Sequence, residues 1–287
     1  MTDALDFPIV DSHVHLWDPH RFRMPWLDDN ARLRQPFGLT EFVEHTDGLP
    51  VEAIVYLQVD VTPAYGLLEA TWAADQAERD SRVAGVVAWA PLEDGMVARS
   101  YLDVLAKLGK PLKGIRRLIQ SEPDPDFHVR ADFLDGLRLL PKYGLSFDIC
   151  IRHDQLARSI DMVRACPETA FVLDHLAKPD VKGHRLEPWR AQMAELAELP
   201  NVVCKVSGLV TEADHAHWTP AELEPYVAHV LAVFGEDRVL FGGDWPVVTM
   251  AASYRQWVTT LDQFTSNLRP IPRQKLWADN ARRVYRL

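Results

Sequence analysis

The chain has 287 residues, 47% of them hydrophobic, and carries 31 basic against 41 acidic side chains, a formal net charge of -10. Its length and apolar content are sufficient for one large folded domain, and its acidic balance disfavours nucleic acid or an anionic membrane as a partner. Residues 1–4 lack the basic and apolar regions of a signal peptide, and no apolar stretch approaches the length of a membrane span. The three cysteines show no pairing pattern, so we expect a cytoplasmic protein.

Short apolar runs alternate with helix-period segments along the whole chain. The runs predict eight strands, at residues 8–16, 51–59, 83–90, 112–119, 146–152, 170–175, 202–207 and 239–243. Between them, Thr62-Pro63 is typical of a helix N-cap followed by proline, and the run at 219–222 is typical of a capping box. Eight strand–helix units in this length predict a (β/α)8 TIM barrel, an α/β fold, as a single domain over residues 1–287. The alternative is an open doubly wound sheet, which is disfavoured because no glycine-rich phosphate turn follows any strand.

The connection between Trp17 and about Thr40 departs from this regular alternation of strands and helices. It is long, aromatic and basic, and contains Trp17, Arg21, Arg23, Trp26, Arg32 and Arg34. Because it follows the first strand, we expect it to lie over the barrel mouth as a lid or substrate wall. The alternative is an insertion without a role at the site.

Polar residues gather where the predicted strands end. His13 and His15 close the first strand, and because side chains alternate along a strand they point the same way. Such a pair can hold a metal ion or donate hydrogen bonds to one carbonyl oxygen. The other strand ends supply Arg116, His153, Asp174, His175, Lys205, Ser207, Asp244 and Trp245. The carboxyl ends of barrel strands meet at one mouth, so we expect one shared site.

Several of these runs resemble the amidohydrolase superfamily. They are Val10-Asp11-Ser12-His13-Val14-His15-Leu16-Trp17-Asp18, Val172-Leu173-Asp174-His175, Lys205-Val206-Ser207-Gly208-Leu209 and Phe241-Gly242-Gly243-Asp244-Trp245-Pro246. More narrowly, they resemble its lactonase branch, which includes L-fuconolactonase, L-rhamnonolactonase and 2-pyrone-4,6-dicarboxylate lactonase. Residues 277–285 resemble the C-terminal helix of that branch. The resemblance spans essentially the whole chain and implies a barrel with an extra C-terminal helix.

The resemblance also implies the reaction, which is hydrolysis of a sugar-derived lactone, such as L-fucono-lactone, to the sugar acid. Asp244 would activate the attacking water, with His13, His15 and His175 as its catalytic partners. One divalent ion, with zinc as the preferred candidate, would take its ligands from the set His13, His15, His153, His175 and Asp244. A binuclear site is not expected, because the fourth strand offers the run Lys113-Gly114-Ile115-Arg116-Arg117 where a bridging lysine or glutamate is usual. Some lactonases of this branch work without a metal, so histidines that polarise the carbonyl directly stay open as the alternative.

The expected partner is a small-molecule sugar lactone. Cationic hydrogen-bond donors suit carboxylates and vicinal hydroxyls, and tryptophan faces suit the C–H side of a sugar ring. The residues expected to contact the substrate are Arg116, Lys205, Trp26, Arg23, Trp245 and Gln58. Two other functions stay open, a metal-dependent decarboxylase of the same superfamily and a barrel that binds sugar acids without catalysis. The sequence is compatible with a homo-oligomer but does not specify one.

Overall fold

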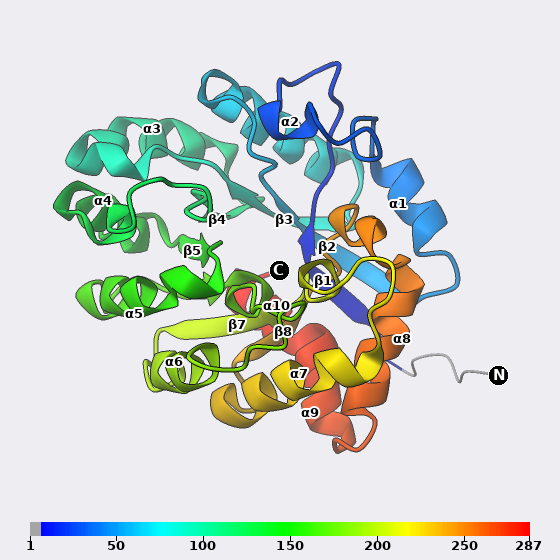
Figure 1. Ribbon diagram of the computed structural model, residues 1–287. Helices are drawn as coiled ribbons and strands as arrows, with labels where there is room; N and C mark the ends of the chain where they lie inside the picture. Colours follow the sequence, from blue (N-terminus) through cyan, green and yellow to red (C-terminus); the bar gives the residue numbers. More distant parts are fainter. Residues whose placement is uncertain (1–6) are drawn as a thin grey trace.

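The eight predicted strands form one parallel sheet in sequence order, which curls into a barrel in the computed structural model of residues 7–287 (Figure 1). The strands are β1 (Ile9–Val14), β2 (Val51–Leu57), β3 (Val83–Ala88), β4 (Leu112–Ile115), β5 (Ser146–Ile149), β6 (Phe171–Leu173), β7 (Val202–Val206) and β8 (Val239–Phe241). Val14 bridges to Trp245 in parallel, which brings the segment after β8 against β1. The TIM-barrel prediction is therefore confirmed. The interpretation of residues 1–4 as lacking a signal peptide lies outside the described residues.

Helices surround the strands and follow them in alternation (Figure 1). They are α1 (Leu39–His45), α2 (Gly66–Arg79), α3 (Ala98–Leu105), α4 (Ala131–Leu137), α5 (Leu156–Ala165), α6 (Trp189–Ala197), α7 (Pro220–Phe234), α8 (Tyr254–Thr265), α9 (Pro270–Gln274) and α10 (Asn280–Tyr285). The predicted capping box is present, because the Glu222 carboxylate accepts the Thr219 backbone N–H at 2.6 Å. Thr62 instead caps a short 3-10 turn, Pro63–Tyr65, and α2 starts only after it.

The C-terminal segment closes one end of the barrel. Inward-facing strand residues pack with three residues of this segment in one buried cluster, which contains Val10, Val55, Leu57, Val87, Val172, Leu240, Ala278, Ala281 and Tyr285. Lys113, near the start of β4, donates to the Arg286 carbonyl oxygen at 2.8 Å, so α10 covers the amino ends of the strands. In Figure 1, α10 projects onto the middle of the barrel. The predicted extra helix is confirmed, and the carboxyl ends of the strands are left to form a mouth.

The connection from Trp17 to Thr40, here called the lid segment, is anchored over that mouth. Trp17 and Phe37 exchange two backbone hydrogen bonds, at 2.9 and 2.8 Å, which close the segment on itself. The indole N–H of Trp26 donates to the Val59 carbonyl oxygen at 2.8 Å, which ties the segment to the chain after β2. Its apolar side chains, Phe22, Met24, Leu27 and Leu33, are buried. The lid segment is thus a packed wall of the mouth.

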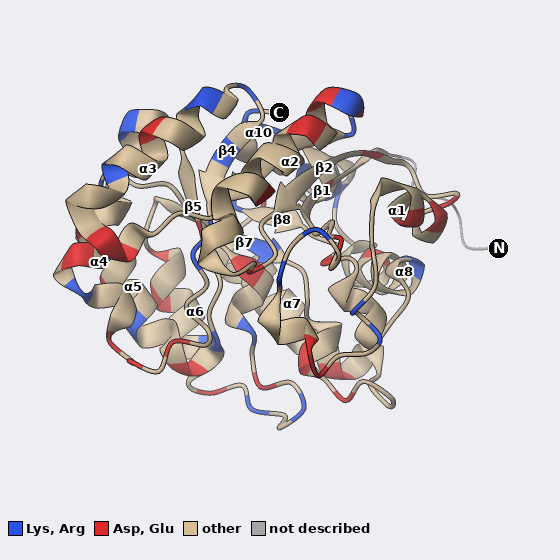
Figure 2. Ribbon diagram, turned by 90° about the horizontal axis from the view of Figure 1, so that it is seen from above, with Lys and Arg blue, Asp and Glu red and all other residues tan. Residues whose placement is uncertain are grey.

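Two further sequence expectations concern the outside of the molecule and the thiols. None of the helices in residues 7–287 combines the length and the apolarity that a membrane span requires. Acidic and basic residues are interspersed over the outer helices (Figure 2). Cys150, Cys166 and Cys204 are free and buried, as the lack of a pairing pattern predicts.

Candidate active site

The two histidines of β1 converge at the barrel mouth. Their Nε2 atoms lie 3.2 Å apart, so both side chains point the same way, as the strand alternation predicts. Nδ1 of His15 lies 2.9 Å from the Leu57 carbonyl oxygen. Because a carbonyl oxygen can only accept, Nδ1 carries the proton and the Nε2 lone pair of His15 faces the site.

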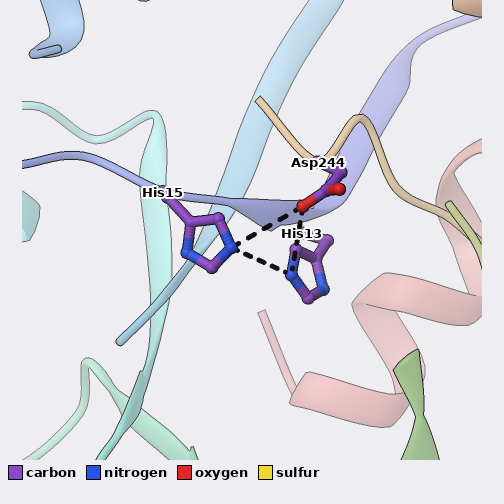
Figure 3. Close-up of side chains that lie close together, drawn as sticks. All are labelled: His13, His15 and Asp244. Carbon is purple, nitrogen blue, oxygen red and sulfur yellow. Dashed lines mark hydrogen bonds and ion pairs between the residues drawn. The ribbon is translucent and has the colours of Figure 1, made fainter. Parts of the chain in front are cut away.

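Asp244 lies opposite this pair, in the turn after β8 (Figure 3). Its Oδ1 is 3.7 Å from Nε2 of His13, 3.7 Å from Nε2 of His15 and 3.8 Å from Nε2 of His175. The residue has a left-handed backbone (φ +53°), a conformation that is uncommon for residues other than glycine and that recurs at functional sites. One carboxylate oxygen therefore faces three imidazole nitrogens.

A buried aspartate holds these two strand ends together. Oδ1 of Asp11 accepts the backbone N–H groups of His13 at 2.9 Å and Gly243 at 2.8 Å, and Oδ2 accepts the Tyr254 hydroxyl at 2.9 Å. Burial raises the pKa of Asp11 to about 6 although these hydrogen bonds favour the carboxylate. Asp11 therefore fixes β1 against the turn that carries Asp244.

His175 is fixed from the neighbouring strand β7. Its Nδ1 lies 2.8 Å from the Ser207 hydroxyl oxygen, and its backbone is left-handed (φ +53°). Gly208 packs directly on the ring, and a Cβ at that position would lie 2.5 Å from Nδ1. Since Gly208 itself has a φ of +59°, both its conformation and the close contact require glycine.

Beneath the histidines lies a layer of buried charges. Asp174 contacts three groups: His13 Nδ1 at 3.2 Å, Lys205 Nζ at 3.0 Å and Arg116 Nη1 at 3.2 Å. Lys205 also pairs with Asp148 at 2.6 Å. Two cations and two carboxylates thus compensate one another inside the barrel, as buried ion pairs require.

Burial sets the protonation of the site. It lowers the pKa of His15 to about 3 and lowers the pKa values of His13 and His175, and in each case desolvation is the main cause. The imidazoles are therefore neutral near pH 7. Desolvation also raises the pKa of Asp244 to about 7, against the charges of Lys178 and Arg116. Asp244 can thus exchange a proton near neutral pH.

A cavity of about 260 Å³ opens above these groups. Its apolar lining comes from Trp17, Trp26, Val59, Leu118, Cys150 and Val247. Its polar lining comes from His15, Asp60, Arg116, Gln120, Ser121, His175, Lys178, Thr211 and Asp244. Trp17 and Trp26 belong to the lid segment, which therefore forms part of the wall of this cavity.

The structure leaves one predicted ligand outside the cluster. His153 is the first residue of a 3-10 turn, His153–Gln155, and is partly exposed. It belongs to neither of the two groups of potential ligands in residues 7–287, which are His13, His15 and Asp244, and His13, Asp174 and His175. β5 ends at Ile149, and Cys150, directly after the strand, lines the cavity, whereas His153 lies four residues beyond the strand and does not.

Two of the expected substrate contacts are buried away from the cavity. Lys205 is fully buried within the layer of ion pairs, because it is an interior residue of β7 rather than a residue beyond it. Trp245 is also fully buried, where its ring packs against Phe37 and Phe42 and its N–H donates to His45 Nδ1 at 2.9 Å. Neither side chain lines the cavity, unlike what the sequence led us to expect.

Two other residues expected to contact the substrate, Gln58 and Arg23, bond to neighbouring protein groups instead. Oε1 of Gln58 accepts the Asp60 backbone N–H at 2.5 Å, and the side chain is buried. Arg23 is half-exposed and forms an ion pair with the equally exposed Asp28, within the lid segment, at 2.5 Å. Gln58 and Arg23 do not line the cavity, whereas Arg116 and Trp26 do.

Sequence reasoning did not identify several lining residues. Asp60, Gln120, Ser121, Lys178 and Thr211 all follow strands by a few residues, in loops whose course no periodicity reports. Asp11 was present in the first motif, but its bond to the turn after β8 depends on how the barrel closes. Only its position two residues before His13 was a signal.

The arrangement of His13, His15 and Asp244 suits one metal ion. Ligand atoms about 2.1 Å from a tetrahedral zinc ion are separated by about 3.4 Å, and the three contacts here are 3.2, 3.7 and 3.7 Å. The outward N–H of His15 bonds a carbonyl, as is usual for histidine ligands. The second group is less suitable, because Asp174 already pairs with Lys205 and Arg116.

Comparison with known proteins identifies relatives over nearly the full length. Residues 10–287 match the protein family described as Amidohydrolase. L-fucono-1,5-lactonase from Burkholderia ambifaria is 34% identical, with 97% of this chain and 95% of the relative covered. The L-fucono-1,5-lactonase from Burkholderia multivorans is 33% identical, with coverage of 97% and 96%. A crystal structure of an amidohydrolase from Burkholderia multivorans with bound zinc superposes with a TM-score of 0.88 at 30% identity, covering 98% of this chain and 99% of that one.

Proposed function

Because the chain belongs to the amidohydrolase family, we propose that it hydrolyses a sugar-derived lactone, such as L-fucono-1,5-lactone, to the sugar acid. The observation that carries this proposal is the position of Asp244, whose Oδ1 lies 3.7 to 3.8 Å from three imidazole nitrogens beside the cavity. Relatives that are named L-fucono-1,5-lactonase at 33% and 34% identity support the substrate class.

Asp244 is the proposed base. Its carboxylate accepts a proton from water as the water oxygen bonds to the lactone carbonyl carbon, and burial has placed its pKa near 7 for this task. The bond from the carbonyl carbon to the ring oxygen then breaks. Asp244 returns the proton to the leaving alkoxide, so that the carboxylate is restored and the open-chain acid is formed.

Two cavity-lining groups are proposed to stabilise the developing negative charge on the carbonyl oxygen. Arg116 is a permanent cation at the cavity floor, and Asp174 orients its guanidinium at 3.2 Å. His175 also faces the cavity and is held by the Ser207 hydroxyl. Donors that are fixed before the reaction stabilise an oxyanion without reorganisation.

His15 has a different proposed role. Its Nε2 presents a lone pair, so it accepts rather than donates and is better suited to a cation than to an oxyanion. We propose that His13, His15 and Asp244 hold one divalent ion, with zinc as the ion that such ligands favour. When bound, the ion would supply a Lewis acid for the lactone carbonyl and the attacking water. The bound zinc in the Burkholderia multivorans amidohydrolase supports this choice.

The remaining lining suits a polyhydroxylated ring. The aromatic faces of Trp17 and Trp26 form one wall, against which the C–H side of a sugar can pack. Gln120, Ser121 and Thr211 supply neutral hydrogen-bonding groups for hydroxyls. The proposal therefore places the ring between an aromatic wall and a polar wall.

Acid release from a panel of aldonolactones tests this proposal. The panel contains the L-fucono, L-rhamnono, D-galactono and D-glucono lactones, each followed with a pH indicator and corrected for spontaneous opening. We expect fast, saturable hydrolysis of at least one 6-deoxy-L-lactone. Rates equal to the uncatalysed reaction for every lactone would contradict the proposed function.

A further inference from the structure

The chain after β6 follows an unusual path beside the site. Four consecutive residues have a left-handed backbone: His175, Leu176, Ala177 and Lys178, with φ values of +53°, +53°, +59° and +48°. None is glycine, so each is held in a conformation that its Cβ disfavours. Strain of this kind persists where the surrounding structure determines it, and it concentrates at functional sites.

Packing on both sides fixes this turn. Leu176 and Ala177 are fully buried, and the Leu176 carbonyl oxygen accepts the Trp189 indole N–H at 2.7 Å. The backbone N–H of Lys178 donates to the His175 carbonyl oxygen at 2.8 Å. One rigid turn therefore positions His175 and Lys178 together, and both side chains line the cavity.

Lys178 is a cation that the protein does not neutralise with an ion pair. Its Nζ donates to a neutral acceptor, Gln120 Oε1, at 2.7 Å. Within residues 7–287 no carboxylate forms an ion pair with it, whereas Arg116, the other cation of the cavity, pairs with Asp174 at 3.2 Å. The charge of Lys178 does act on Glu212, but burial raises the pKa of that carboxyl, which weakens it as a counter-ion.

Lys178 is also electrostatically close to the proposed base. Among the charges around Asp244, that of Lys178 contributes most to lowering its pKa. The ammonium group therefore acts on the part of the cavity where the carbonyl group of the substrate would react. A lactone is neutral there, but its hydrolysis product carries a carboxylate.

We propose that the Lys178 ammonium binds the carboxylate that ring opening creates, so that Lys178 determines how tightly the site holds the product acid. An ammonium forms a strong charge-assisted hydrogen bond with a carboxylate and only an ordinary one with a neutral oxygen. Gln120 holds the ammonium in place until the acid is present. The identity of this carboxylate rests on the proposed lactonase function, but the anion site itself does not.

Binding of two matched probes tests the proposal. L-fuconate and L-fuconamide carry the same hydroxyl groups, but only the first has a charge, and calorimetric titration of the intact protein gives Kd for each. We expect Lys178→Met to raise Kd for L-fuconate at least tenfold and to leave Kd for L-fuconamide within twofold. Lys178→Arg should restore most of the L-fuconate affinity. The matched control is Lys182→Met, because Lys182 is exposed on the same connection and faces Asp214 at 3.7 Å.

Two results would overturn the assignment. One is an unchanged Kd for L-fuconate in Lys178→Met. The other is an equal loss for both probes, since a merely structural lysine would disturb the charged and the neutral ligand alike.

Citrate, a carboxylate without a sugar ring, separates this proposal from the lactonase proposal. If the wild type binds citrate but neither sugar probe, and Lys178→Met abolishes that binding, the anion site stands and the sugar assignment is wrong. If the wild type binds no carboxylate but hydrolyses a lactone, the anion site is wrong and the proposed function stands.

Discussion

The backbone N–H of Asp244 donates to the carbonyl oxygen of His13 at 2.8 Å. A second hydrogen bond, from the His15 N–H to the Trp245 carbonyl oxygen at 2.8 Å, also joins the end of β1 to the turn after β8. The contacts that close the barrel are therefore the contacts that set the proposed base beside the β1 histidines. Positional accuracy at the site depends on barrel closure, which is a property of rigid elements rather than of a loop.

The metal content of histidine variants tests the proposed ligand set. We expect His15→Ala to lose the divalent ion, because it removes one of three ligand atoms that lie within 3.7 Å of one another. His153→Ala should keep the wild-type stoichiometry, because His153 lies outside the cluster. Elemental analysis of the purified proteins measures both, and a loss of metal in His153→Ala alone would contradict the assignment.

Gly208→Ala should damage both stability and turnover. A Cβ at Gly208 would lie 2.5 Å from His175 Nδ1, and the φ of +59° adds backbone strain. We expect a loss of about 1–3 kcal/mol in the free energy of unfolding, together with reduced kcat. The control is Gly144→Ala, where φ is +66° but the space around the Cβ is open, so only the strain of about 1 kcal/mol applies. Equal stability and full activity in Gly208→Ala would show that the contact does not constrain His175.

Glu69 should make stability depend on pH. Burial raises the pKa of this carboxyl to about 7, while its Oε1 accepts the Tyr56 hydroxyl and the Val59 N–H. The folded protein binds this proton more tightly than the unfolded chain does. The resulting stabilisation, roughly 3 kcal/mol at most, is fully present below the unfolded-state pKa and is lost as the pH rises to about 7.

Glu69→Gln removes this titration, so its unfolding free energy should vary less between pH 4.5 and 7 than that of the wild type. Chemical denaturation at a series of pH values measures the difference. Parallel curves for the two proteins would contradict the assignment to Glu69.

Asp244 should set the acid limb of the activity profile. Because burial raises its pKa to about 7 and only the carboxylate can accept a proton, kcat/KM of metal-depleted enzyme should fall about tenfold per pH unit below that value and level off above it. A bound cation favours the carboxylate, so zinc should shift the inflection to lower pH. A flat profile between pH 5 and 9, after correction for spontaneous opening, would argue against Asp244 as the base.

The barrel could be predicted from the sequence because buried parallel strands appear as short apolar runs at regular spacing. The strand ends predicted that His13, His15, His175 and Asp244 lie close together, and the structure brings these four side chains together. The apolar runs did not report how far below the barrel mouth each residue lies. Lys205 lies inside β7 and therefore below the mouth, although it is near the end of the same run.

The other differences arise in loops. His153 follows β5 by four residues, at the start of a 3-10 turn, and lies outside the cavity lining. Lys178 lines the cavity at the end of a turn of four left-handed residues, which no periodicity or composition predicts. Loop conformation depends on packing with distant residues, so it is the part of the site that a single sequence reports least.

The most direct test of the central claim compares kcat/KM for the best lactone of the panel in wild type, Asp244→Asn and Asp75→Asn, which changes an exposed aspartate of α2. General-base catalysis contributes about 10²–10⁴-fold, so Asp244→Asn should lose at least a hundredfold while its thermal unfolding stays cooperative, and Asp75→Asn should match the wild type. If Asp244→Asn retained a near-normal rate, Asp244 would not be the base and the proposed mechanism would be wrong.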